Sequence, residues 1–280
     1  MKRKTRLGTL GLLSAALLLV TACAGGMAGS RAAFHSWPSG TTVTYEMVTN
    51  QTMMISVPGQ GDQSMPSTSS MTFEVAAAGP RTFEVSVVDV TSDAPTDMSM
   101  GMVPEATDLI GSSGTVTLDE QGLIVENSGF EGNPYVDFMG ADAFAEQSLQ
   151  VLFQYLPVEG TLEVGQEWNR EYTYPFNIIG IGLDFSNQDA YVCTEALTYE
   201  GVPALKIAST TQNAMSGGGE VMGAIMDLAM AGSSEGTAII DAMTGMLLES
   251  EGVIKMGGGI SAQGMDIPMD MEMRITIKRK

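Results

Sequence analysis

Three blocks of sequence recur in the same order in the two halves of this chain, and the repeat strongly constrains the fold. The matching pairs are 40–45 with 165–170, 82–88 with 204–210, and 108–126 with 227–249. Gly114 and Gly236 lie 122 residues apart, and the other pairs keep nearly the same offset. Two copies are too few for a solenoid, so the repeat predicts one sheet with two related halves. The alternative is that unrelated β-hairpins resemble one another.

From Trp37 onward the sequence alternates apolar and polar residues in short runs rich in Thr, Val, Tyr and Phe. Such runs are found at 43–47, 71–75, 82–87 and 204–208. Period-two alternation is typical of antiparallel strands with one covered and one solvated face. The chain is therefore predicted to be mainly β.

Two segments carry helical patterns. In 141–156, Leu149, Leu152 and Leu156 recur at steps of three and four, and Pro157 follows. This spacing predicts an amphipathic helix. A shorter helix is expected over 220–231, and both should cover the apolar face of the sheet.

These patterns predict an α+β, mainly β fold with one domain over 37–280. We expect a strongly curved antiparallel sheet, or half-barrel, built from pseudo-repeats 37–133 and 158–280. The main amphipathic helix, at about 139–157, joins the repeats and packs on the concave face.

The first 22 residues predict a lipoprotein signal peptide. A basic start precedes an apolar run that is short for a spanning helix, which needs ~20 residues. The small residues before Cys23 predict that this cysteine is lipidated and becomes the N-terminus. Residues 23–36, including His35, then form a flexible tether to the domain. The alternative is an ordinary secretory signal.

A lipidated Cys23 would place the protein in the cell envelope, with the membrane as its partner through the acyl chains. Ala24 follows the cysteine instead of a retention aspartate. We therefore expect the periplasmic face of the outer membrane if the host has two membranes.

Acidic residues dominate the mature chain. Four of the 13 basic residues lie in the signal, so nine oppose 33 acidic residues and the net charge is −24. This balance argues against nucleic-acid binding. It indicates a solvated acidic surface, and a cation-binding surface is the alternative. Cys193, the other cysteine besides Cys23, is expected to be a buried apolar residue without a disulfide partner.

The mature chain contains 21 methionines, and two groups alternate along the sequence. The groups are Met98, Met100 and Met102, and Met269, Met271 and Met273. Alternate residues of a strand share a face, so each group would present a row of thioethers, a ligand type that suits Cu(I). The favoured interpretation is an inward face that packs the core or lines an apolar groove.

No motif of a known catalytic or nucleotide site is present, and the single histidine lies in the tether. We therefore expect that the protein is not an enzyme and that it needs no cofactor. The oxygen-rich segment 184–189 offers ligands that Ca²⁺ accepts, although a hairpin loop is the favoured interpretation.

The combination of a helix and a curved sheet in a lipidated protein resembles that of the half-barrel lipoproteins. This group contains the Lol-type lipoprotein carriers and their mycobacterial lipid-binding relatives. The segments 151–157 and 164–168 also resemble a family of duplicated bacterial lipoproteins of unknown function. In that family a helix ends in Leu-Pro and Gly-x-x-Trp begins the next strand. The resemblance implies a fold and a hydrophobic cavity.

The function expected from the sequence is apolar ligand binding by a non-enzymatic envelope lipoprotein. The ligand would be a lipid or another apolar molecule on the concave face. The expected lining residues are Leu149, Leu152, Leu156, Met269, Met271 and Met273. The alternatives are a structural or interaction lipoprotein with a self-filled core, and a Met-rich Cu(I) protein.

Overall fold

A computed structural model describes residues 37–280 except 58, 60, 94–103, 121, 157–161, 179–180, 222–223 and 263. Its strands are β1 (Thr42–Val57), β2 (Gly61–Gly79), β3 (Thr82–Ser92), β4 (Ser113–Leu118), β5 (Ile124–Ser128), β6 (Glu167–Ile178), β7 (Ile181–Tyr199), β8 (Val202–Val221), β9 (Ala224–Asp241), β10 (Leu247–Ala262) and β11 (Met265–Arg279).

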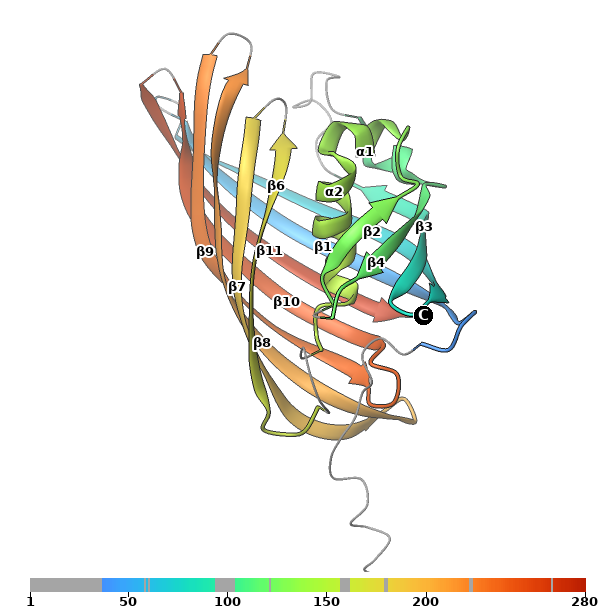
Figure 1. The fold of residues 1–280 in the computed structure, drawn as a ribbon. Coiled ribbons are helices and arrows are strands. Elements are labelled where there is room, and N and C mark those ends of the chain that lie inside the picture. The colour runs from blue at the N-terminus through green and yellow to red at the C-terminus, as the bar shows by residue number, and fades with distance from the viewer. Residues whose placement is uncertain are drawn as a thin grey trace, which may run out of the picture.

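All these strands form one antiparallel sheet of 11 strands. The order is β5-β4-β3-β2-β1-β11-β10-β9-β8-β7-β6, so β11 pairs with β1 and joins the two halves. The sheet curls strongly around the helical segment without closing into a barrel (Figure 1). The predicted mainly β, strongly curved sheet with a helix on its concave side is confirmed.

Glycines on the concave face let the long strands approach one another closely. A Cβ added at Gly232 of β9 would lie 1.9 Å from the Lys255 carbonyl oxygen, and one at Gly258 of β10 would lie 2.0 Å from the Ala229 carbonyl oxygen. No side chain fits at these distances. The glycine-rich sequence of the second half is therefore matched to a sheet that bends sharply inward.

The helical segment lies between β5 and β6. It contains α1 (Pro134–Met139), α2 (Ala141–Phe144), the π-helix η3 (Ala145–Leu149) and the 3-10 helix η4 (Gln150–Leu152), and a further 3-10 turn, η2 (Ala106–Leu109), precedes β4. The Asn133 side chain accepts hydrogen bonds from the Tyr135 and Val136 amides and caps α1. No helix in the described part of the chain is long and apolar enough to cross a membrane.

The predicted helix bounds need two corrections. Helix α2 begins at Ala141, as predicted, after the separate short helix α1, but residues 153–156 form turns instead of the last residues of the helix. The helix predicted over 220–231 is wrong, since 220–221 belong to strand β8 and 224–231 to strand β9. β9 pairs with β8 and β10 along its length, and Leu228 and Met230 alternate onto the concave face. Pairing on both sides overrides a short apolar pattern that also suits a helix.

The beginnings of the two halves share a backbone arrangement. The Gly40 amide donates to the Ala77 carbonyl at 3.0 Å, and the Gly165 amide donates to the Cys193 carbonyl at 2.7 Å. Both glycines have positive φ and lie just before the first strand of their half. This shared geometry supports the predicted duplication.

The turns after β4 and β9 also match. Asp119 and Asp241 each accept a hydrogen bond from a backbone amide through the side chain, from Leu123 in the first turn and Met243 in the second. The two aspartates lie 122 residues apart, which is the offset of the sequence repeat.

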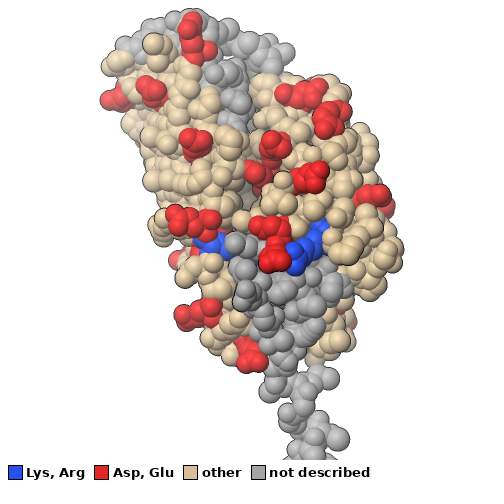
Figure 2. Space-filling view, viewed as in Figure 1, with Lys and Arg blue, Asp and Glu red and all other residues tan. Residues whose placement is uncertain are grey.

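Acidic side chains are spread over the visible face of the molecule, and basic side chains are few there (Figure 2). The described ion pairs, such as Lys255 with Glu272 at 3.8 Å, lie between partly exposed side chains. Exposed pairs of this kind contribute little to stability, so burial on the concave face must hold the fold.

Candidate functional site

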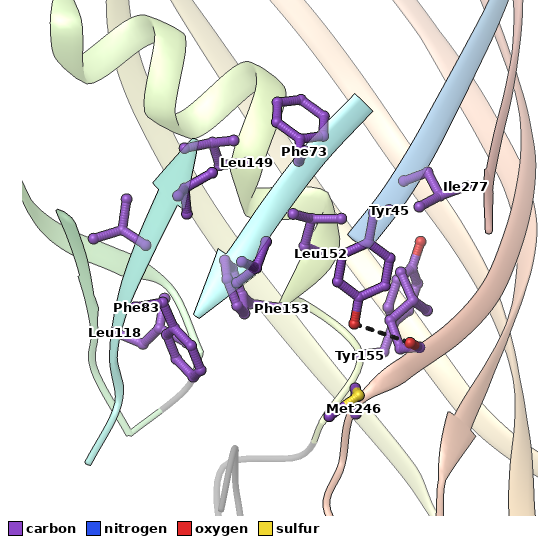
Figure 3. Close-up of a cluster of buried hydrophobic side chains, with 14 of the residues drawn as sticks. Tyr45, Phe73, Phe83, Leu118, Leu149, Leu152, Phe153, Tyr155, Met246 and Ile277 are labelled. Atoms are coloured by element: carbon purple, nitrogen blue, oxygen red, sulfur yellow. Dashed lines mark hydrogen bonds between the residues drawn. The ribbon is translucent and has the colours of Figure 1, made fainter. Parts of the chain in front are cut away.

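The concave face consists of three zones, of which the first is an aliphatic and aromatic core filled by the helical segment. Tyr45 and Phe73 from the sheet pack with Leu149 and Phe153 from the segment that crosses it (Figure 3). The Tyr45 hydroxyl donates to the Leu247 carbonyl at 3.0 Å, a buried hydrogen bond between β1 and β10. This zone is closed by the protein's own side chains.

The second zone is a polar belt on β6 to β9, whose side chains point inward by the strand register. We define it as Arg170, Asn187, Asp189, Thr211, Asn213 and Ser234. Arg170 and Asp189 are each only 4% exposed. The guanidinium of Arg170 donates to the carbonyls of Gln154 and Leu156, so this side chain ties β6 to the end of the helical segment.

The charged members of the belt are strongly affected by burial. Burial raises the pKa of Asp189, whereas hydrogen bonds from Tyr191 and Thr211 and the charge of Arg170 lower it. The Tyr191 hydroxyl donates to Asp189 at 2.8 Å, and Arg170 lies 5.7 Å from the centre of the Tyr191 ring. One buried positive charge and one buried negative charge therefore lie close together and are held by neighbours.

The third zone is an apolar layer further along the strands, away from the aliphatic core. We define the Met layer as Met53, Ile55, Phe185, Met215, Leu228, Met230, Ile254, Met256, Ile260, Met269 and Met271. Every member comes from a strand. Three members, Phe185, Met215 and Leu228, also pack against a small cluster of Tyr174, Leu183 and the helical residue Ala143. Most of the layer is only partly buried. It is an apolar surface made of flexible thioether and aliphatic side chains.

A small cavity separates the aliphatic core from the polar belt. Its volume is about 90 Å³, and it lies between Tyr155 of the helical segment's end and the inward face of β7 to β11. Hydroxyl-bearing residues, among them Ser209, Thr211, Ser234 and Ser250, line it together with Ile254 and Ile275. The cavity thus has both hydroxyl-bearing and apolar walls.

Comparisons with known proteins assign no family. No family model matches the chain, and no curated protein matches it. Among solved structures, OccK11 of Pseudomonas aeruginosa is similar at 8% identity and a TM-score of 0.27, covering 88% of this chain and 99% of that chain. A loop-deletion mutant of OmpT, an outer membrane protein of Vibrio cholerae, is similar at 7% identity and a TM-score of 0.24, with coverages of 86% and 100%. Similarity at this level carries no inference about function, and the resemblance to Lol-type carriers finds no support here.

The structure separates the residues predicted to line an apolar ligand. Leu149, Leu152 and Leu156 are at most 3% exposed and belong to the filled aliphatic core. These side chains therefore do not line a surface that is open to a ligand. Met269 and Met271 lie in the Met layer, and Met273 also faces inward, between Gln51 and Ile254. The Met98, Met100 and Met102 group, Cys23 and His35 lie outside the described residues.

The segment 184–189 is not the predicted hairpin loop. It forms the middle of β7 and pairs on both sides, with β6 and β8. No group of three or more His, Cys, Asp or Glu side chains that could hold a metal occurs within the described ranges. Cys193 is fully buried in the aliphatic core, and burial raises the pKa of its thiol.

Sequence reasoning missed the polar belt. In 186–189 all four residues are polar, so alternation does not reveal that Asn187 and Asp189 face inward. Arg170 offers a weak signal, since it follows Trp168 by two positions and so shares the face of an aromatic residue.

Proposed function

We propose that this protein is a lipid-anchored envelope protein that holds an apolar ligand, an acyl chain of a lipid, on the Met layer of its concave face. Cys23 would carry the anchor, and the outer membrane is the proposed location if the host has two membranes. The observation that supports the proposal is the Met layer, a continuous apolar surface whose described members all come from strands.

The composition of the layer suits an acyl chain. Methionine side chains are unbranched and adapt to irregular apolar shapes, as known for promiscuous binding surfaces. Met53, Met256 and Met271 pair directly across β1, β11 and β10, so their side chains form one row on the concave face. A linear hydrocarbon lying along that row would be removed from water on one side by the sheet.

Equilibrium binding of a fluorescent fatty acid tests the proposal, and two neighbouring residues provide a matched pair of variants. Met53 faces the Met layer, whereas Met54 is 43% exposed on the opposite, convex face of β1. Met53→Gln should weaken binding by roughly fivefold, because it places an amide against the chain, and Met54→Gln should leave binding unchanged. Absence of binding by the wild type, or equal effects of the two variants, would contradict the proposal.

The second candidate is a structural or interaction lipoprotein with a self-filled concave face. It is favoured by the aliphatic core, in which the protein's own helical segment already covers part of that face. Under this function the same experiment shows no saturable uptake of the fatty acid.

A further inference from the structure

The polar belt contains two buried hydrogen-bond donors that no described group satisfies. The Nδ2 atom of Asn213 has no hydrogen-bond partner among the described residues, and Asn213 is only 6% exposed. The Nε atom of Arg170 is also buried without a partner there, although its other two nitrogens donate to carbonyls. An unmade hydrogen bond at a buried donor is costly, so both positions favour an incoming acceptor oxygen.

The belt and the Met layer adjoin each other on the concave face, and one cross-strand row runs from the belt into the layer. Asn213 of β8 pairs with Gly232 of β9, which pairs with Met256 of β10, and Met271 and Met53 continue the row. Neighbouring strands are ~4.8 Å apart, so Asn213 and Met256 lie about 10 Å apart with only a glycine between them. A molecule lying along this row contacts donors at one end and thioethers at the other.

Charge and space restrict the group that these donors can receive. Arg170 and Asp189 are buried and pair directly across β6 and β7, so the one basic side chain of the belt already has an acidic neighbour, and an added buried carboxylate or phosphate would lack a counter-charge. The cavity of about 90 Å³, which the belt residues Thr211 and Ser234 line, holds roughly three waters at ~30 Å³ each, and this space suits a head of a few heavy atoms. Its serine and threonine hydroxyls are suited to polar, uncharged groups.

We infer that the polar belt binds the small, uncharged, acceptor-bearing head of the ligand, an ester carbonyl attached to an acyl chain, in preference to a carboxylate. This inference rests on the proposed function, since the acyl chain occupies the Met layer. Asn213 is the residue that selects the ester, and Arg170 is a second donor at the same end.

Displacement of the fluorescent fatty acid from the full chain carrying Cys23→Ala tests this selection. Three competitors separate the contributions: hexadecane has a chain only, oleate adds a carboxylate, and monoolein adds an ester with a small hydroxyl-bearing head. At pH 8 monoolein should compete at least fivefold better than oleate, because the belt has no charge to offer the carboxylate. Oleate competing as well as monoolein would overturn the inference even if all three bind, whereas failure of hexadecane and both lipids would overturn the proposed function itself.

Asn213 and its neighbour provide the variants. Asn213→Leu keeps the volume and removes the donor, so monoolein should lose roughly fivefold in competition while hexadecane changes little. Asn213→Ser keeps a hydroxyl donor and should lose less. Gln212→Leu, on the exposed face of β8, is the control that changes a similar side chain without touching the belt. If water alone satisfies the donor, Asn213→Leu leaves the ratio of monoolein to hexadecane unchanged, and the inference is wrong.

Discussion

Asn213 and Met256 face the same side of the sheet in one cross-strand row, and Gly232 lies between them. The boundary between the polar belt and the Met layer also crosses β8, where Met215 follows Asn213 by two positions on the same face. Both zones are displayed by paired strands, whose spacing is fixed by backbone hydrogen bonds. This placement gives the concave face a rigid surface with a polar and an apolar end.

Gly232 is predicted to be essential for this arrangement. In Gly232→Ala the new Cβ would lie 1.9 Å from the Lys255 carbonyl oxygen. The backbone of β10 cannot move away freely, because it is hydrogen-bonded to β9. We expect a loss of about 2–3 kcal/mol in the free energy of unfolding, measured by urea denaturation. Gly252→Ala is the matched control, because its Cβ would approach no closer than 3.5 Å, and it should change stability by under ~1 kcal/mol. Equal losses in the two variants would show that the close approach at Gly232 is not what requires glycine.

Glu146 is predicted to make stability depend on pH. Burial and the nearby charge of Asp142 raise the pKa of its carboxyl to about 7, and its Oε2 atom has no partner among the described residues. Between pH 4.5 and 7 the folded state therefore holds a proton that the unfolded state has lost. This contribution to stability is complete below pH 4.5 and disappears as the pH rises through about 7.

The test compares urea denaturation at pH 5 and pH 8. Because the Glu146 side chain is only partly buried, we expect its share of the lost free energy of unfolding to be roughly 1 kcal/mol after discounting for solvent screening. Glu146→Gln should remove that share, whereas Glu163→Gln at an exposed position should retain it. A Glu146→Gln variant with the pH dependence of the wild type would contradict the account.

The Met layer is predicted to pack apolar groups and not to bind copper. The triple variant Met269→Leu, Met271→Leu and Met273→Leu keeps the volume, so each change should cost under about 1.5 kcal/mol of the free energy of unfolding. Neither the wild type nor this variant should take Cu(I) from a chromogenic chelator. Competition by the wild type that the folded triple variant loses would establish a thioether copper site instead.

Much of the architecture could be predicted from the sequence. Alternation from Trp37 onward indicated the antiparallel sheet, and the spacing of Leu149 and Leu152 indicated the helix that fills it. The inward orientation of Met269 and Met271 also followed from alternation, because period two fixes which residues share a face.

The polar belt and the β9 strand could not be predicted in the same way. The register between β8 and β9 decides whether the Asn213 side chain points to the concave or the convex face. Its neighbours in sequence are not apolar enough to show which face is buried. The pattern around Ile225 and Leu228 suits a helix as well as a strand, so long-range pairing decides between them. The cavity beside Thr211 depends on side chains from β7 to β11 and from the helical segment, which no local pattern brings together.

Native mass spectrometry of the protein purified from its host membrane tests the central claim most directly. The proposed function predicts a population with one non-covalent lipid per chain, in addition to the mass of the anchor at Cys23. Neutral acylglycerols should be enriched in that population over free fatty acids. A spectrum that shows only the anchored chain, before and after incubation with monoolein, would contradict ligand binding and favour a self-filled structural protein.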